Sequence, residues 1–496
     1  MKLIPVKSSA LAIVLGLSAP LAAQTANAQP GATPDIAARI DAVFTVHAGT
    51  DAPGCAVGVS LAGDIVFAKG YGMASLEHGV PITAQTAFDI GSVAKQFTAA
   101  AVRLLEQRGR LSLDNDVRRY VPELPDYGTP ITLRNLLQHT SGLRDYGTLE
   151  SLAGRHVRTM PEFIGLLARQ RALNFVPGER HEYSHSDYSV LALAIERAAG
   201  EGFGQFIERE LLQPLGMTSS RVHDSRGAAV PGRALAYAET GHGYSVIFPR
   251  NEIVGGAKLY TTVEDLLRWE RNFHEPVVGG RALMDALVAR PRLASGATIP
   301  YASGLRIGEY RGLPTVHRSG GGTFASEMLR FPEQRLAVVT LCNTSASHPR
   351  YLSQEVAALY LAEQMQSLAV VPARRQVETP QDELVRYAGV YRPLETPWNI
   401  LRIAARDGAL QEVFPDSGWY CQSMSLSKYS SAFPSRSCGS RRPPHWRNSP
   451  AASTARSWTR PGAAVPRWRG AGTGHADVCR RQAADGGVRR GHRRFS

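Results

Sequence analysis

Cysteine is scarce in this 496-residue chain, which excludes a small fold held together by many disulfides. Three of the five cysteines, Cys421, Cys438 and Cys479, lie in the last 76 residues. The other two, Cys55 and Cys342, sit in short apolar runs typical of strands. We therefore expect Cys55 and Cys342 to be two buried thiols rather than parts of a disulfide framework.

The chain also lacks a long hydrophobic run. Its first apolar stretch, residues 10–17, is too short to cross a bilayer as a helix. Lys2 and Lys7 precede this stretch and Ala26-Asn27-Ala28 follows it, which is the layout of a secretory signal peptide. We predict a signal peptide over residues 1–28, export to the bacterial periplasm and no membrane span after cleavage. An uncleaved N-terminal anchor is the alternative.

Most of the chain has no net charge, although the formal total is +13. Residues 421–496 hold 15 Lys and Arg against two Asp, which leaves 41 basic and 41 acidic residues in 1–420. We therefore expect no nucleic-acid partner for the neutral part. The Arg-rich tail shows no apolar periodicity, so we predict that it is disordered. Its abrupt start suggests a changed reading frame, and an unstable product is one further possibility. A genuine basic interaction tail is the alternative.

The apolar pattern predicts strands at both ends of one domain and helices between them. Residues 56–60 and 65–69 form an expected hairpin, residues 110–300 read as mostly helical, and strand patterns return between 303 and 341. We predict an α+β fold in which an antiparallel sheet is flanked by helices and joined to a large, mostly helical lobe. The predicted boundaries are 33–366 for this domain, 367–380 for a linker and 381–420 for a truncated small β module.

The candidate nucleophile lies at the start of a predicted helix. Ser92 and Lys95 are three residues apart, so their side chains share one face of that helix. A buried Lys can accept the proton of a neighbouring hydroxyl, and backbone N–H groups at a helix start can hold an oxyanion. The Ser-x-x-Lys pattern is weak evidence by itself, because it also occurs by chance at Ser425 and Lys428 in the tail.

Two further residues complete the constellation. Tyr183 precedes a predicted helix, and His317 stands at the end of a predicted strand before a glycine-rich turn. With these residues the chain resembles the serine β-lactamase-like family of penicillin-recognising enzymes, over about residues 35–365. The family includes class C β-lactamases, D-alanyl-D-alanine carboxypeptidases, D-aminopeptidases and related esterases. The matching stretches, in the order of the family, are 92–95, 131–143, 177–179, 183–185, 214–217, 261–266, 317 and 329–332.

The resemblance implies a role for each matching residue. Ser92 is the nucleophile that becomes acylated, and Lys95 with Tyr183 takes its proton and passes it to the leaving group. His317 places a cationic or hydrogen-bonding group opposite the substrate carboxylate. The backbone N–H groups of Ser92 and Gly320 form the oxyanion hole. No metal and no cofactor is implied.

The chain departs from the family pattern at two substrate-binding positions. His185 stands where the second motif usually has Asn, and Ser319 stands where the third motif usually has Gly. An imidazole reproduces the donor and acceptor of a carboxamide in only one tautomer. Both departures weaken the case for efficient penicillin hydrolysis more than the case for acyl transfer.

The sequence therefore predicts a serine hydrolase that forms an acyl-enzyme with β-lactams, D-alanyl peptides or small esters and amides, in an undetermined oligomeric state. A non-hydrolytic penicillin-binding or sensor module is one alternative. Residues 181–185 also match the zinc-protease pattern His-Glu-x-x-His, but we expect His181 and His185 to lie in a loop. The chain has no Gly-x-Ser-x-Gly elbow, which disfavours an α/β-hydrolase.

Overall fold

A computed structural model describes most of the chain between residues 34 and 412. The described ranges are 34–225, 228–240, 242–367, 380–391, 401–406 and 409–412. The predicted signal peptide, most of the predicted linker and the predicted disordered tail lie outside these residues.

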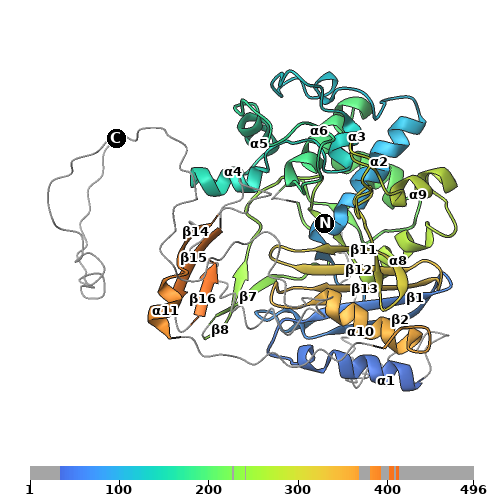
Figure 1. Cartoon of the computed structure of the whole chain (residues 1–496). Coiled ribbons are helices and arrows are strands. Elements are labelled where there is room, and N and C mark those ends of the chain that lie inside the picture. The colour runs from blue at the N-terminus through green and yellow to red at the C-terminus, as the bar shows by residue number, and fades with distance from the viewer. Residues whose placement is uncertain are drawn as a thin grey trace, which may run out of the picture. The chain divides into compact units, whose positions relative to one another are not determined.

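A six-stranded antiparallel sheet is the frame of the main domain (Figure 1). Its strands, in spatial order, are β10 (Arg306–Tyr310), β11 (Leu313–Gly320), β12 (Ala325–Phe331), β13 (Leu336–Cys342), β1 (Cys55–Leu61) and β2 (Asp64–Tyr71). β1 lies between its hairpin partner β2 and the late strand β13. The sheet is therefore assembled from both ends of the domain, as the sequence predicts.

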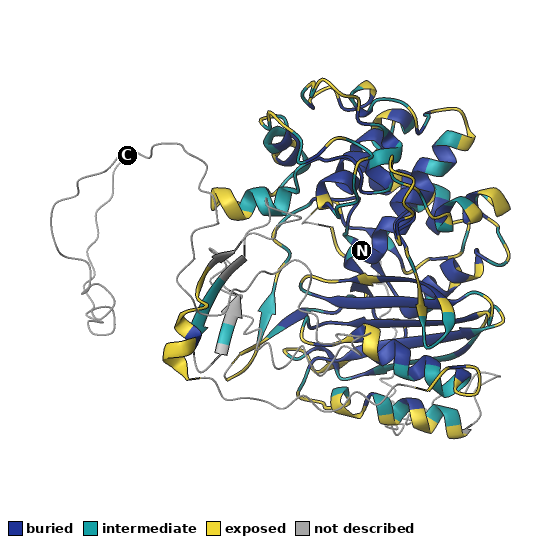
Figure 2. Cartoon of the chain, in the orientation of Figure 1, coloured by how far each residue is buried: buried dark blue, intermediate teal, exposed yellow. Residues whose placement is uncertain are grey.

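Side chains of the sheet alternate between two hydrophobic cores. Along β13, Leu336 and Val338 face a core shared with α1 (Pro34–Val43) and α10 (Pro349–Leu361). Val339 and Leu341 belong to the other core, which contains α8 (Val263–Arg271) and the helical lobe. This is the two-residue period of a strand buried on both faces. Figure 2 shows buried residues along both the sheet and the interior of the lobe.

The segment between the two halves of the sheet is mostly helical, which confirms the predicted lobe. Its helices are η2 (Gly91–Ala94), α2 (Lys95–Gln107), η3 (Val117–Arg119), α3 (Leu133–Leu137), α4 (Tyr146–Ala153), α5 (Met160–Leu167), α6 (His185–Ala199), α7 (Phe203–Ile207), the π-helical turn Glu208–Leu212, α8 and α9 (Gly280–Val288). Short strands accompany them: β3 (Met73–Ser75), β4 (Val80–Pro81), β5 (Phe88–Asp89), β6 (Arg221–Val222), β7 (Ala236–Thr240), β8 (Gly243–Ile247) and β9 (Leu259–Thr261). α2 packs along α6 and α9.

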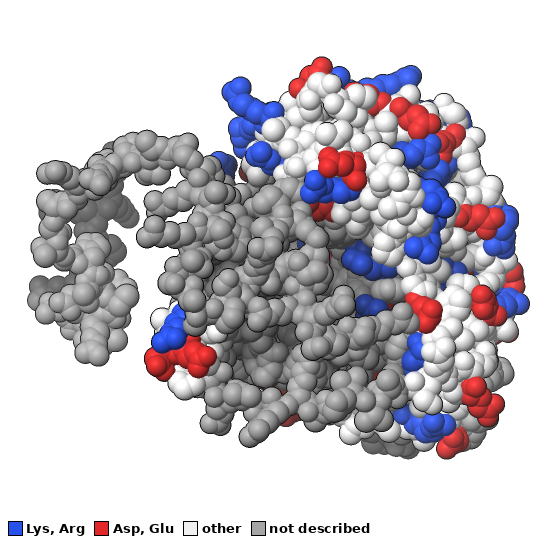
Figure 3. All heavy atoms as spheres, viewed as in Figure 1, with Lys and Arg blue, Asp and Glu red and all other residues white. Residues whose placement is uncertain are grey.

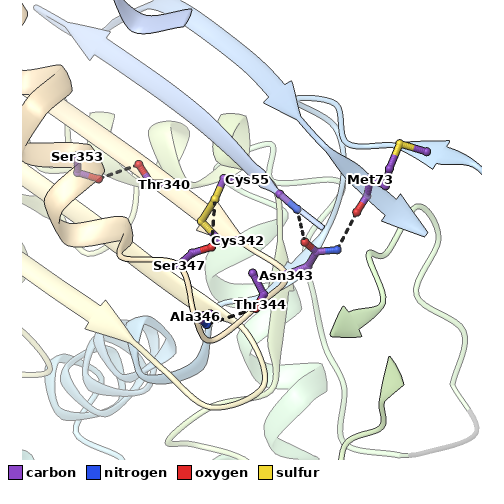
Figure 4. Close-up of a disulfide and its surroundings, with 10 residues drawn as sticks. Cys55, Met73, Thr340, Cys342, Asn343, Thr344, Ala346, Ser347 and Ser353 are labelled. Atoms are coloured by element: carbon purple, nitrogen blue, oxygen red, sulfur yellow. Dashed lines mark hydrogen bonds between the residues drawn. A yellow bond between two sulfur atoms is a disulfide. The ribbon is translucent and has the colours of Figure 1, made fainter. Parts of the chain in front are cut away.

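Cys55 and Cys342 form a disulfide, so the prediction of two buried thiols is wrong (Figure 4). The two residues are directly opposite in the β1–β13 register and both are fully buried. Ser347 Oγ lies 3.8 Å from Cys55 Sγ. The error arose because strand pairing across a separation of 287 residues is a tertiary property that local patterns do not contain.

The described residues beyond 380 form a short helix and a small sheet of their own. α11 (Gln381–Val385) is followed by β14 (Gly389–Tyr391), β15 (Leu401–Arg406) and β16 (Ala409–Glu412), which pair antiparallel in that order. These strands lie in the stretch for which the sequence predicts a partial β module.

Two further observations concern charge and hydropathy on the described residues. On the face shown in Figure 3, basic and acidic side chains are interspersed. Over the residues that the structure describes, no helix has both the length and the apolar character needed to cross a membrane.

Candidate active site

Ser92 lies in the single turn η2, directly before α2. Asp89 Oδ1 accepts a hydrogen bond of 3.0 Å from the N–H of Gly91, which fixes the chain as it turns from β5 into η2. Gly91 has a φ of +50°, a conformation that glycine adopts without the cost paid by other residues. Ser92 stays partly exposed although both of its neighbours are buried. The turn therefore presents one hydroxyl to solvent from a rigid, buried segment.

Lys95 is completely buried beside this hydroxyl. Its Nζ lies 3.2 Å from Ser92 Oγ and donates a hydrogen bond of 2.8 Å to the carbonyl of Gly256. A Cβ on Gly256 would stand 3.1 Å from Lys95 Nζ, so glycine permits this close approach. Burial lowers the pKa of Lys95, because the charged ammonium loses hydration. A lowered pKa is what a lysine needs in order to accept the Ser92 proton.

Tyr183 reaches the same hydroxyl from the loop before α6. Its Oη lies 2.8 Å from Ser92 Oγ, and Lys95 Nζ stands 5.1 Å from the centre of its ring. Burial alone would raise the pKa of Tyr183, but the positive charges of Lys95 and Arg318 outweigh burial and lower it. The structure thus brings together the three residues that the sequence predicts as the catalytic group: Ser92, Lys95 and Tyr183.

Arg318 is a site residue that the sequence analysis missed. Its Nη2 donates a hydrogen bond of 2.7 Å to Tyr183 Oη, and its Nε donates one of 3.1 Å to the carbonyl of Ser92. Its guanidinium also stands 4.9 Å from the centre of the Tyr183 ring. Arg318 is 4 % exposed, so these interactions take place largely out of water.

His317, which the sequence assigns to this place, faces away from Ser92. Successive residues of a strand point to opposite faces of the sheet. On β11, Val316 belongs to the core shared with the helical lobe, so Arg318 points toward the lobe and His317 points to the other face. His317 Nδ1 lies 3.0 Å from Oε1 of the buried Glu327. We therefore reassign the cationic position from His317 to Arg318.

Ser319 pairs with the same carboxylate. Its Oγ donates a short hydrogen bond to Glu327 Oε2, although the residue itself is exposed. Once Arg318 is taken as the cation, Arg318-Ser319-Gly320 has the spacing of cation, any residue and glycine that His317-Arg318-Ser319 lacks. When the third motif is taken to begin at Arg318 instead of His317, its glycine is present as Gly320.

Gly320 lets β11 approach the nucleophile turn closely. A Cβ at Gly320 would lie 2.1 Å from the carbonyl oxygen of Ile90 and 3.0 Å from the amide nitrogen of Ser92. Contacts of 2.1 Å do not occur between such atoms, so any other residue here would push β11 away from Ser92. The glycine that follows the predicted strand already indicates a close backbone approach at this position.

The hydrogen-bond alternation of β11 identifies which amide faces the open edge of the strand. Tyr310 and Leu313 close a two-residue turn in which Arg311 and Gly312 both have positive φ, so this closing pair is hydrogen bonded. Every second residue from Leu313 therefore bonds toward β10, which starts opposite His317. Continued one residue past the end of β11, the alternation would direct the amide of Gly321 to the open edge, and a Cβ on Gly91 would lie 3.1 Å from that nitrogen. We therefore replace Gly320, the second oxyanion donor expected from the sequence, by Gly321.

His185 begins α6 and is open to solvent within the site. Its backbone N–H donates a hydrogen bond of 2.6 Å to Asp145 Oδ2, and its ring meets the rings of Tyr183 and Tyr146 edge to face. Surrounding protein and the charge of Lys95 lower the pKa of His185 to about 4. The imidazole is therefore neutral at neutral pH and offers one donor and one acceptor.

The structure does not have the geometry that a His-Glu-x-x-His zinc site requires. His181 lies in the loop before α6, whereas His185 is the first residue of that helix, so the two do not share a helix face. Among the residues described, no three His, Cys, Asp or Glu side chains are grouped so that they could hold a metal ion.

The chain is similar in sequence to known proteins. The model of the family described as "Beta-lactamase" matches residues 40–363. A penicillin-binding protein of Bacillus subtilis is 28% identical over 299 residues, which is 57% of this chain and 66% of that protein. A D-aminopeptidase of Brucella ovis is 29% identical over 306 residues, which is 59% of this chain and 56% of that enzyme. The chain thus matches between about half and just under two thirds of the length of these relatives.

The fold is also similar to that of solved structures. The octameric penicillin-binding protein homologue from Pyrococcus abyssi superposes with a TM-score of 0.59 and 24% identity, over 76% of this chain and 87% of that chain. At this level of identity the likeness shows the fold alone. The family model, however, matches more than half of the 496 residues. Together with the Ser92 site, this match confirms the resemblance inferred from the motifs: the chain belongs to the beta-lactamase family.

Proposed function

We propose that this protein is a serine acyl hydrolase that works through a covalent acyl-enzyme on Ser92. The observation that carries the proposal is the position of Ser92 Oγ, 2.8 Å from Tyr183 Oη and 3.2 Å from Lys95 Nζ. Both distances are within reach of direct proton transfer. Whichever of the two groups is deprotonated can therefore take the proton of the attacking hydroxyl, and the lowered pKa of each favours that form.

In the first half-reaction Ser92 Oγ attacks the substrate carbonyl while its proton passes to Tyr183 or Lys95. The oxyanion that forms is held by the N–H groups of Ser92 and Gly321. The carbonyl re-forms as the bond to the leaving group breaks, and the leaving group takes the stored proton. Water then attacks the acyl-enzyme with the same base, which releases the carboxylic acid and restores Ser92.

The proposed substrates are small molecules or peptides: β-lactams, D-amino-acid peptides or short esters and amides. Arg318 gives the site a cation, which favours a substrate that carries a carboxylate near the scissile bond. The names of the two relatives above, a penicillin-binding protein and a D-aminopeptidase, support β-lactams and D-peptides. Export to the periplasm fits both the N-terminal sequence and a disulfide, which persists in an oxidising compartment.

The proposal is tested by parallel assays with a chromogenic cephalosporin, a p-nitrophenyl ester and a D-alanyl peptide. We expect Ser92→Ala to abolish turnover of the best substrate and labelling by a fluorophosphonate or penicillin probe. A chelator should leave the activity unchanged. Full activity of a folded Ser92→Ala variant would show that the nucleophile is elsewhere.

A second candidate is a penicillin-binding module that acylates without turnover. The observation that favours it is His185, which replaces the Asn expected beside Tyr183 with a larger, neutral ring. A burst of product equal to the enzyme concentration, followed by no further release, would identify this function.

His185 also allows a prediction about substrate preference. A carboxamide can donate to and accept from the amide side chain of a β-lactam, which an imidazole matches in only one tautomer. We expect His185→Asn to raise the ratio of kcat/KM for the cephalosporin to kcat/KM for the ester by about tenfold, the typical worth of one well-placed hydrogen bond. An unchanged ratio would mean that His185 does not contact the substrate side chain.

A further inference from the structure

Behind Tyr183 lies a buried pair of titratable residues that the acyl-transfer steps do not use. His139, just after α3, and Asp187, on α6, are both fully buried, and His139 Nδ1 lies 2.8 Å from Asp187 Oδ2. Burial lowers the pKa of His139 and raises that of Asp187, so the pair is held without net charge. His139 also has a φ of +55°, which is uncommon for a residue other than glycine.

His139 binds the backbone on both sides of Tyr183. Its carbonyl accepts a hydrogen bond of 2.9 Å from the N–H of Glu182, and its Nδ1 lies 3.3 Å from the N–H of Ser184. Its ring meets the Tyr183 ring edge to face, with 4.5 Å between their centres. One residue, through its carbonyl and its ring, thus contacts three consecutive residues of the loop that carries Tyr183.

The pair is anchored at its far ends. Asp187 Oδ1 accepts a hydrogen bond of 2.6 Å from Ser141 Oγ, and His139 Nε2 lies 3.0 Å from Tyr301 Oη. Tyr301 is 1% exposed, and its ring centre stands 5.6 Å from the guanidinium of Arg318. The loop after α3, helix α6 and the segment before β10 therefore meet in one hydrogen-bonded cluster.

We propose that the His139–Asp187 pair, with Tyr301, is a positioning unit that holds the Tyr183 hydroxyl against Ser92. This inference rests on the proposed function of Tyr183 in proton transfer. Tyr183 lies in a loop and not within a helix or strand, so the geometry of its 2.8 Å contact with Ser92 depends on what supports that loop. The cluster supplies that support through a hydrogen bond to the loop backbone and a ring contact with Tyr183.

The Tyr301→Phe variant tests the unit with the smallest change. It removes the hydroxyl bonded to His139 and leaves the ring that lies beside Arg318. The matched control is Ser353→Ala, which removes another buried hydrogen bond, 2.8 Å long, between Ser353 Oγ and Thr340 Oγ1. In the full chain we expect Tyr301→Phe to lower kcat for the p-nitrophenyl ester about tenfold with KM within about twofold, since small misplacements of a reacting group act on the chemical step.

The control separates positioning from folding. We expect Ser353→Ala to lower the melting temperature as Tyr301→Phe does while kcat stays at the wild-type value. Unchanged kcat in Tyr301→Phe, or equal losses of kcat in both variants, would overturn the inference.

A conservative replacement provides the second measurement. An Asn at position 187 can keep both contacts, because its amide N–H can donate to His139 Nδ1 while its oxygen accepts from Ser141 Oγ. We expect Asp187→Asn to retain kcat within about threefold and Asp187→Ala to lose at least tenfold more. Equal losses in both, at equal melting temperature, would refute the role of the shared hydrogen bond. If Ser92→Ala stayed active, the proposed function would fail first, whatever these variants show.

Discussion

Replacement of Arg318 by Gln tests the electrostatics of the site. Arg318 donates a hydrogen bond of 2.7 Å to Tyr183 Oη, and a cation in this position favours the phenolate over the phenol. An opposite charge within about 4–6 Å lowers a pKa by about 1–3 units. Its loss should therefore raise the pKa of Tyr183 by about that amount. A smaller fraction of Tyr183 is then deprotonated at neutral pH, so the acidic limb of kcat/KM moves to higher pH by the same 1–3 units.

The assay is kcat/KM for the p-nitrophenyl ester across the pH range in which the protein remains folded. The matched control is His317→Gln, which changes the adjacent residue on the opposite face of β11 and should leave the acidic limb in place. A shift in His317→Gln, with none in Arg318→Gln, would refute the reassignment of the cationic position. Equal profiles for all three proteins would show that Tyr183 does not set the acidic limb.

Two predictions concern stability. Reduction of the Cys55–Cys342 disulfide should lower the free energy of unfolding by about 2–5 kcal/mol, because the unfolded chain gains conformational freedom when the long loop is released. Urea unfolding with and without reductant measures this change. Glu270→Gln should cost about 3–5 kcal/mol in the same assay, because it leaves the guanidinium of Arg330 buried without a counter-charge. Glu270 and Arg330 are 2% and 3% exposed, and Nε lies 3.7 Å from Oε1.

Each stability prediction has a control. A Cys342→Ser variant should unfold at the midpoint of the reduced wild type and should not respond to reductant. Identical midpoints of the wild-type protein with and without reductant would contradict the first prediction. For the second, the exposed Glu275 pairs with Arg271, and Glu275→Gln should change stability by less than about 1 kcal/mol. Similar effects of Glu270→Gln and Glu275→Gln would contradict it.

The sequence was sufficient where the determining information is local. Ser92 and Lys95 are three residues apart on one helical turn, so their meeting follows from helix geometry. The two-residue period of the strands and the long helical segment between them were likewise enough to predict a sheet built from both ends of the domain. The order of several motifs predicted Tyr183 as a catalytic residue, and in the structure its hydroxyl contacts that of Ser92.

Tertiary structure alone decided the remaining features, because each depends on which face of an element meets a distant one. A shift of one residue along β11 exchanges the faces of His317 and Arg318, and only packing against η2 reveals which of them reaches Ser92. The pairing of β1 with β13 brings Cys55 opposite Cys342. His139 lies in the family-like stretch 131–143, but its meeting with Asp187 requires α3 and α6 to pack, so no local pattern joins the two residues.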